Sequence, residues 1–243
     1  MSRKKPNIAD DFAKVYKPLK ALVIYQSISD SDAYIESFDI NPDNGEMLNA
    51  HPLNLKECAQ IGQIVSEMPQ MKYNFLYCNG ILPENLLNVS TQLGNPHAIW
   101  YTPARKTEMN FSKSLNIPNG TAFVPPMLWK ADKENLWVFA LESDARPSYK
   151  TQLFHAPYFN IYNEGRVCMG TVNVNITEDI GLIDFMAKWE QYFFNSDFSH
   201  TIAQTSPISE NIVSFWQRHI GSDKKFNTNI LTKTAITLKS LFN

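Results

Sequence analysis

The sequence predicts an α+β protein in which an antiparallel β-meander is followed by helices, with a smaller α+β unit before the meander. From residue 98 to residue 162, short segments rich in β-branched and aromatic residues alternate with turn-prone segments, which is typical of neighbouring antiparallel strands. After residue 177, apolar residues recur at helical spacing instead. We place a soft boundary near residue 92, so that residues 1–92 form the N-terminal unit and residues 93–243 the second domain.

Residues 20–50 are expected to contain paired strands, because two segments rich in β-formers are followed by a turn at Asn44-Gly45. The segment 54–68 is expected to be a helix capped by Asn54, with Cys58 on its apolar face and therefore in the core. Residues 72–82 resemble a strand, near whose end Cys78 is expected to pack.

The meander is expected to comprise five segments, separated by turns and interrupted by prolines: 98–103, 107–112, 120–131, 135–143 and 151–162. Three helices should follow. The first covers 177–194, with Thr177 and two acidic residues at its positive end, and the second covers 209–221, with Ser209 as cap. The third covers 229–242.

Composition excludes several classes of function. A net charge of −2 gives no basic footprint for nucleic acid, and no apolar run approaches the length of a membrane span. The N-terminal residues lack the apolar segment of a secretory signal, so we expect a cytoplasmic protein. The three cysteines are then free thiols, and no metal-binding or phosphate-binding motif is present, so neither a metal nor a cofactor is expected.

Cys168 is the cysteine whose surroundings suggest chemistry. Gly165 makes a turn before it and Arg166 brings a positive charge, a setting that favours the thiolate, although the local residues alone favour packing. His155 and His200 are candidate bases, and Asn160 is a candidate donor to an oxyanion. Histidine and asparagine also have purely structural uses, so these alternatives stay open.

The stretch "YFNIYNEGRVC" carries a resemblance to a known family. Its Asn160, Tyr162, Gly165 and Cys168 have the spacing of the active-site segment of ubiquitin-conjugating enzymes, with Tyr158 and Phe159 in place of that family's histidine and proline. This likeness covers roughly residues 95–220. The segments "APYFNIYNEGRVCMGTV" and "WEQYFFNSDFSH" are more closely similar to the PRTRC system protein B family, which is similar to what is called prokaryotic ubiquitin-conjugating family D. That bacterial family is associated with plasmids and mobile elements.

The resemblance implies a ubiquitin-conjugating-like fold and an acyl-transfer reaction. Cys168 would carry the C-terminal carbonyl of a ubiquitin-like protein as a thioester, which an amine then attacks. Asn160 would hold the developing oxyanion or brace the loop that does so. Tyr162 would pack under the loop, Gly165 would permit its turn, and His155 and His200 would be supporting residues.

The resemblance also implies partners, namely a ubiquitin-like protein, a ThiF-like activating enzyme and a JAB-type peptidase. Two other hypotheses remain. In one, the chain is a catalytically inactive binding module of the same fold, in which Cys168 is incidental. In the other, it is a thiol hydrolase that uses Cys168 and His200.

Overall fold

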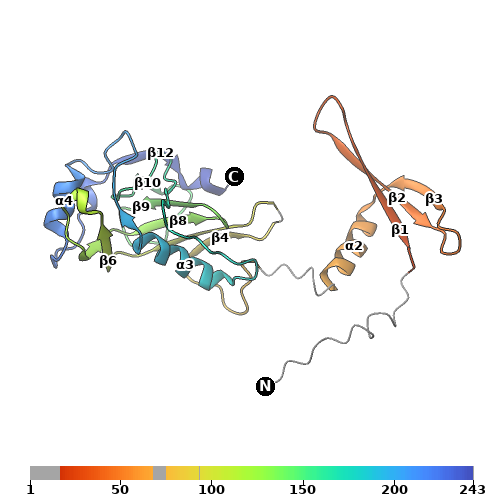
Figure 1. Cartoon of the computed structure of the whole chain (residues 1–243), viewed down its shortest axis with the longest axis horizontal. Coiled ribbons are helices and arrows are strands. Elements are labelled where there is room, and N and C mark those ends of the chain that lie inside the picture. The colour runs from red at the N-terminus through yellow and green to blue at the C-terminus, as the bar shows by residue number, and fades with distance from the viewer. Residues whose placement is uncertain (1–16, 68–74, 93, 243) are drawn as a thin grey trace, which may run out of the picture. The chain divides into compact units, whose positions relative to one another are not determined.

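The computed structural model describes residues 17–67, 75–92 and 94–242 of the 243-residue chain (Figure 1). The chain divides into two compact units, residues 1–72 and residues 73–243, which we describe separately. Strand β4 (Leu86–Ser90) lies in the second unit, although we expected the N-terminal unit to extend to residue 92.

The N-terminal unit contains a three-stranded antiparallel sheet followed by one helix. The strands are β1 (Lys20–Gln26), β2 (Ala33–Ile40) and β3 (Met47–Pro52), in that spatial order. The helix is α2 (Leu55–Glu67). The expected cap is confirmed, because the backbone N–H of Glu57 donates to Asn54 Oδ1 at 3.1 Å, and Asn54 Nδ2 donates back to Glu57 Oε2 at 2.8 Å. The cap and the glutamate three residues later thus satisfy each other at the start of the helix.

The prediction that Cys58 is in the core is wrong, because its side chain is exposed. Glu57, one residue earlier and about 100° away around the helix, is the buried residue. Its carboxylate accepts hydrogen bonds from Lys20 Nζ at 2.7 Å and from the fully buried Ser37 Oγ at 3.2 Å, and it lies 3.0 Å from His51 Nε2. The buried residue in this turn of the helix is therefore a glutamate within a polar network, and the cysteine that the apolar pattern placed in the core is exposed.

This network should make the N-terminal unit sensitive to acid. The hydrogen bond from Lys20, with further ones from His51 and Asn54, lowers the pKa of Glu57 from 4.5 to about 2, although burial opposes this. A lowered pKa contributes stability above pH 4.5 that is lost as the pH falls towards 2. A hydrogen bond to the Asn49 carbonyl and the contact with Glu57 raise the pKa of His51 above 6.5. That contribution is complete below pH 6.5 and is lost as the pH rises through the raised value.

We therefore expect amide protection in β2 and α2, corrected for intrinsic exchange rates, to fall between pH 4.5 and pH 2. Hydrogen exchange of the full chain followed by mass spectrometry measures this. Glu57→Gln should weaken the pH dependence but not remove it, because Asn49 and Lys20 also lower the pKa of Asp39. If amide protection in the wild-type N-terminal unit stayed unchanged down to pH 2, ionised Glu57 would not be what stabilises this unit.

The second unit is built on a six-stranded antiparallel sheet in the order β12-β10-β9-β8-β5-β4. The strands after β4 are β5 (His97–Thr102), β8 (Met127–Ala131), β9 (Leu136–Ala140), β10 (Gln152–His155) and β12 (Lys233–Thr237). A separate hairpin of β6 (Arg105–Phe111) and β7 (Gly120–Val124) is joined by β11 (Asp197–Phe198), parallel to β6. The α+β class is confirmed, but the expected single meander is not, because β6 and β7 lie in a separate sheet and the expected segment 120–131 is divided between β7 and β8, which belong to different sheets.

Two of the three expected helices are present, with different starts. Helix α3 covers Leu182–Phe194, so Thr177 and its acidic neighbours precede the helix rather than opening it. Helix α4 covers Ile212–His219, and Asn211 caps it by accepting a hydrogen bond from Ser214 N at 2.9 Å. The prediction of Ser209 as the cap is therefore wrong.

The prediction of a closing helix over residues 229–242 is also wrong. This segment holds strand β12 between two short 3-10 helices, η3 (Thr228–Ile230) and η4 (Leu238–Phe242). Thr234, Ile236 and Thr237 are β-branched residues that favour an extended chain, and the edge of β10 is available to pair with them. In the expected strand 72–82, residues 72–74 lie outside the described residues, and the described remainder makes a single bridge, between Tyr77 and Gly181. Cys78 packs against the core as expected.

Both faces of the six-stranded sheet are covered (Figure 1). On one face, Phe185, Trp189 and Phe193 of α3 pack with the large core cluster that includes Trp100 and Trp129. On the other face, the C-terminal 3-10 helix packs against a smaller cluster: Ile99, Leu128, Phe139, Leu141, Leu153, Leu238 and Leu241. The chain that leaves β10 is buried from residue 156 to residue 161, and this burial positions the candidate site.

Candidate functional site

Aromatic packing anchors the chain where it leaves β10. Tyr158 and Phe159 are 3% and 1% exposed, and the Tyr158 ring stacks on Phe198 and Trp216 at centroid distances of 5.5 and 5.7 Å. The indole N–H of Trp216 donates to the Pro157 carbonyl at 2.7 Å. Burial raises the pKa of Tyr158. Tyr158 and Phe159, the two residues before Asn160, therefore belong to the core.

After a turn, the chain returns along the free part of the β9 edge. Val138 N donates to Gly165 O at 2.9 Å, and Val167 N donates to Leu136 O at 2.8 Å. Gly165 has a φ of +84°, a left-handed conformation that glycine adopts without cost. Cys168 is the next residue after this pairing, so the sheet fixes the position of the cysteine at the point where the chain leaves the sheet.

Gly165→Ala should destabilise the second unit. A Cβ there would lie 2.5 Å from Phe139 Cζ, and the positive φ adds strain. Overpacking and left-handed strain together cost about 3 kcal/mol, which lowers the melting temperature by roughly 6–12 °C. Gly170→Ala is the matched control, because its φ is +53° and no atom lies within 4 Å of the added Cβ.

Thermal unfolding followed by tryptophan fluorescence compares the two variants. All five tryptophans belong to the second unit: Trp100, Trp129, Trp137, Trp189 and Trp216. Gly170→Ala should lose only the backbone contribution, about 1 kcal/mol. Equal losses in the two variants would rule out the contact with Phe139 as the cause.

Asn160 fastens the cysteine segment to the loop that follows α3. Its backbone N–H donates to His200 O at 2.8 Å, and its carbonyl accepts from Cys168 N at 2.8 Å. Its side-chain Nδ2 donates to Asp197 O at 2.9 Å. Its Oδ1 accepts from Ser199 N at 3.2 Å, Ser199 Oγ at 2.9 Å and His200 N at 3.3 Å. With a φ of +60° and 9% exposure, the residue joins two segments that are distant in sequence.

Cys168 and Asn160 open onto one groove of about 660 Å³. The groove is lined by Phe111, Ser112, Lys113, Asn119, Asn160, Cys168, Met169, Gly170, Thr171, Val172, Ser196, Asp197, Ser199 and His200. The Cys168 side chain is partly exposed, and His200 is exposed. The groove therefore offers a thiol, an imidazole, an ammonium group and a carboxylate to whatever enters it.

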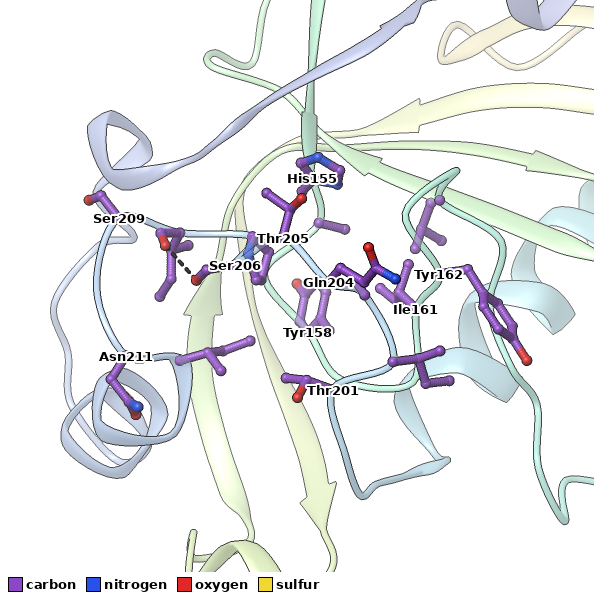
Figure 2. A pocket seen from close by; sticks show the side chains of 18 of the residues that line it. His155, Tyr158, Ile161, Tyr162, Thr201, Gln204, Thr205, Ser206, Ser209 and Asn211 are labelled. Carbon is purple, nitrogen blue, oxygen red and sulfur yellow. Dashed lines mark hydrogen bonds between the residues drawn. The ribbon is translucent and has the colours of Figure 1, made fainter.

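The other predicted site residues lie elsewhere. His155, Tyr162 and Gly165 line a second cavity of about 580 Å³, together with residues 201–212 (Figure 2). Partial burial lowers the pKa of His155. The Arg166 guanidinium stacks 4.4 Å from the Tyr162 ring centroid and lies 3.6 Å from Glu164 Oε1. The structure thus groups Asn160, Cys168 and His200, and it does not bring His155 or Tyr162 to them.

Three groove residues escaped the sequence analysis. Ser199 is next to His200, so its hydroxyl could have been considered with that histidine. Asp197 lies in the same short segment. Lys113, on the 3-10 helix η2 (Lys113–Leu115) between β6 and β7, gives no signal in the sequence. Its approach to Cys168 depends on the pairing of β6 with β11, which joins distant parts of the chain.

No group of three or more histidine, cysteine, aspartate or glutamate side chains within the described ranges is placed to hold a metal ion. Among the helices of the described part of the chain, none has both the length and the apolar character to cross a bilayer.

Neither a curated protein nor a solved structure matches the chain. The model of the family described as prokaryotic E2 family D matches residues 64–234. This range includes the segment from Asn160 to Cys168, the loop 197–200 and the helices α3 and α4. The chain belongs to prokaryotic E2 family D and is an E2-like protein.

Proposed function

We propose that this protein carries a ubiquitin-like protein as a thioester on Cys168 and transfers it to an amine. The observation that carries the proposal is the hydrogen bond between Cys168 N and Asn160 O, which holds the thiol and the asparagine at one open groove. A thiol that is accessible and fixed in position suits an acyl carrier, because transfer in two steps replaces one difficult reaction.

In this proposal the second unit has a ubiquitin-conjugating-like fold, with the cysteine between a meander and two helices. Asn160, which lines the groove, braces the loop 197–200 through its Oδ1, which accepts three hydrogen bonds. Its Nδ2 donates one hydrogen to the Asp197 carbonyl, which leaves the other hydrogen for a developing oxyanion.

The closer sequence likeness supports a setting in a bacterial mobile-element (PRTRC) system, in the cytoplasm. The partners there would be a ThiF-like activating enzyme, a ubiquitin-like protein and a JAB-type peptidase.

The experiment is a reconstitution with the activating enzyme, the ubiquitin-like protein and ATP. We expect an adduct on the full chain that requires ATP and is released by a thiol reductant. If no adduct forms, although the activating enzyme itself is charged, the carrier function is excluded.

A non-catalytic binding module is the second candidate. It is favoured by the burial of Tyr158 and Phe159, because core residues then stand where ubiquitin-conjugating enzymes have a histidine and a proline. This candidate predicts binding of the ubiquitin-like protein or the activating enzyme without any adduct, which the same reconstitution detects when it is combined with a binding measurement.

A further inference from the structure

The orientation of the Asn160 amide follows from its hydrogen-bond partners. Nδ2 donates to the Asp197 carbonyl at 2.9 Å, while Oδ1 faces the backbone N–H groups of Ser199 and His200 at 3.2 and 3.3 Å. A flipped amide would place its NH₂ against two N–H donors and its oxygen against a carbonyl oxygen. The oxygen that faces Ser199 is therefore Oδ1, which can only accept.

This orientation determines where the hydroxyl hydrogen of Ser199 goes. Ser199 Oγ lies 2.9 Å from Asn160 Oδ1, so its single hydrogen is donated to that oxygen. Ser199 Oγ also lies 2.8 Å from His200 Nδ1. Having no second hydrogen, the hydroxyl must accept there, and Nδ1 must carry a proton. A neutral imidazole protonated on Nδ1 has an unprotonated Nε2.

The unprotonated nitrogen belongs to a side chain at the groove of Cys168. The His200 side chain lines this groove, and its Nε2 has no hydrogen-bond partner among the described residues. The other charged side chains at the groove are Lys113 and Asp197. The Asp197 carboxylate attracts a cationic amine, whereas His200 offers the nitrogen that can take a proton from it.

We propose that His200 is the base that deprotonates the attacking amine, with Ser199 and Asn160 as positioning residues that hold its tautomer. This inference rests on the proposed carrier function. As the amine nitrogen bonds to the thioester carbonyl carbon, Nε2 accepts the proton that the nitrogen loses. The carbon–sulfur bond then breaks, and Cys168 leaves as a thiolate, which the imidazolium can protonate. The products are an amide and the free thiol, with no net change in protons.

The test separates loading from transfer. The full chain is charged with the ubiquitin-like protein, activation is stopped by removing ATP, and free lysine is added while the thioester and the lysine conjugate are followed. His200→Ala keeps the backbone N–H that donates to Asn160 Oδ1, so we expect the rate of Cys168 loading to stay within twofold of the wild-type rate. Formation of the lysine conjugate should fall on the order of 10²-fold. Ser199→Ala should give a smaller loss, because both tautomers become accessible.

Rescue by imidazole distinguishes a base from a structural residue. His200 is exposed and the groove is open, so added imidazole should restore conjugate formation at least tenfold in His200→Ala. Thr201→Ala, the exposed neighbour that lines the second cavity, is the control for non-specific effects of imidazole and should behave as wild type.

Two outcomes would overturn the inference while leaving the carrier function intact. One is a loaded His200→Ala protein that transfers to lysine at the wild-type rate, or that transfers slowly and is not rescued by imidazole. The other is loss of loading in a His200→Ala protein with an unchanged melting temperature, which would assign the imidazole to the thiol rather than to the amine. Failure of the wild-type protein to load would instead remove the proposed function itself.

Discussion

Cys168→Ser should abolish the thiol-sensitive adduct completely and leave in its place a smaller amount of an adduct that resists reductant. Serine is nearly isosteric with cysteine, and the backbone N–H of residue 168 keeps its bond to the Asn160 carbonyl, so the loop should keep its geometry. An oxygen at this position forms an ester, which is less reactive towards amines than a thioester. The adduct is measured by gel electrophoresis with and without reductant.

The chain offers its own controls, because it contains two other free thiols. Cys58 is exposed on α2, and Cys78 is partly exposed and packs against the core. Cys58→Ser and Cys78→Ser should both keep the full adduct. An adduct that survives in Cys168→Ser with unchanged reductant sensitivity, or that disappears in Cys58→Ser, would show that the carrier thiol is a different one.

Asn160→Gly should slow transfer to an amine by about 100-fold while slowing loading far less. Glycine takes the φ of +60° without strain, so the variant removes the side chain alone. The N–H and O–H groups of Ser199 and His200 that donate to Oδ1 are then left unpaired. Each lost hydrogen bond costs about 1 kcal/mol of stability. About 2–3 kcal/mol of loop stability is roughly a factor of 100 in the population of the ordered loop. Loading depends on Cys168, whose bond to the backbone of residue 160 remains.

Two companion variants sharpen this prediction. Asn160→Ala removes the same hydrogen bonds and adds left-handed strain of about 1 kcal/mol, so it should transfer no faster than the glycine variant. Asn160→Asp keeps an oxygen for the N–H donors but sets a second oxygen against the Asp197 carbonyl, so it should be intermediate. Single-turnover transfer to free lysine measures all three. Equal losses of loading and transfer at an unchanged melting temperature would contradict the bracing role.

Local patterns predicted most of the strands, because side-chain alternation and turn residues act over a few positions. The turn chemistry at Asn44-Gly45 marks a boundary that the structure keeps, whereas Pro125 and Pro126 divide the expected segment 120–131 into β7 and β8. Prediction failed where tertiary contacts override local preference. Residues 229–242 have helical spacing of apolar residues, yet they form β12 because the edge of β10 is free to pair. Cys58 fits an apolar face, yet Glu57 is buried because four donors satisfy its carboxylate.

The sequence by itself determined that Asn160, Gly165 and Cys168 lie on one turn, because their separation along the chain is short and glycine permits the required backbone. Tertiary structure alone decided what this turn faces. It brought Ser199 and His200 to Asn160, placed Lys113 at the same groove, and directed His155 into another cavity. Hydrogen bonds and β-pairings between segments far apart in sequence make these choices, and residues that meet in this way leave no local periodicity to read.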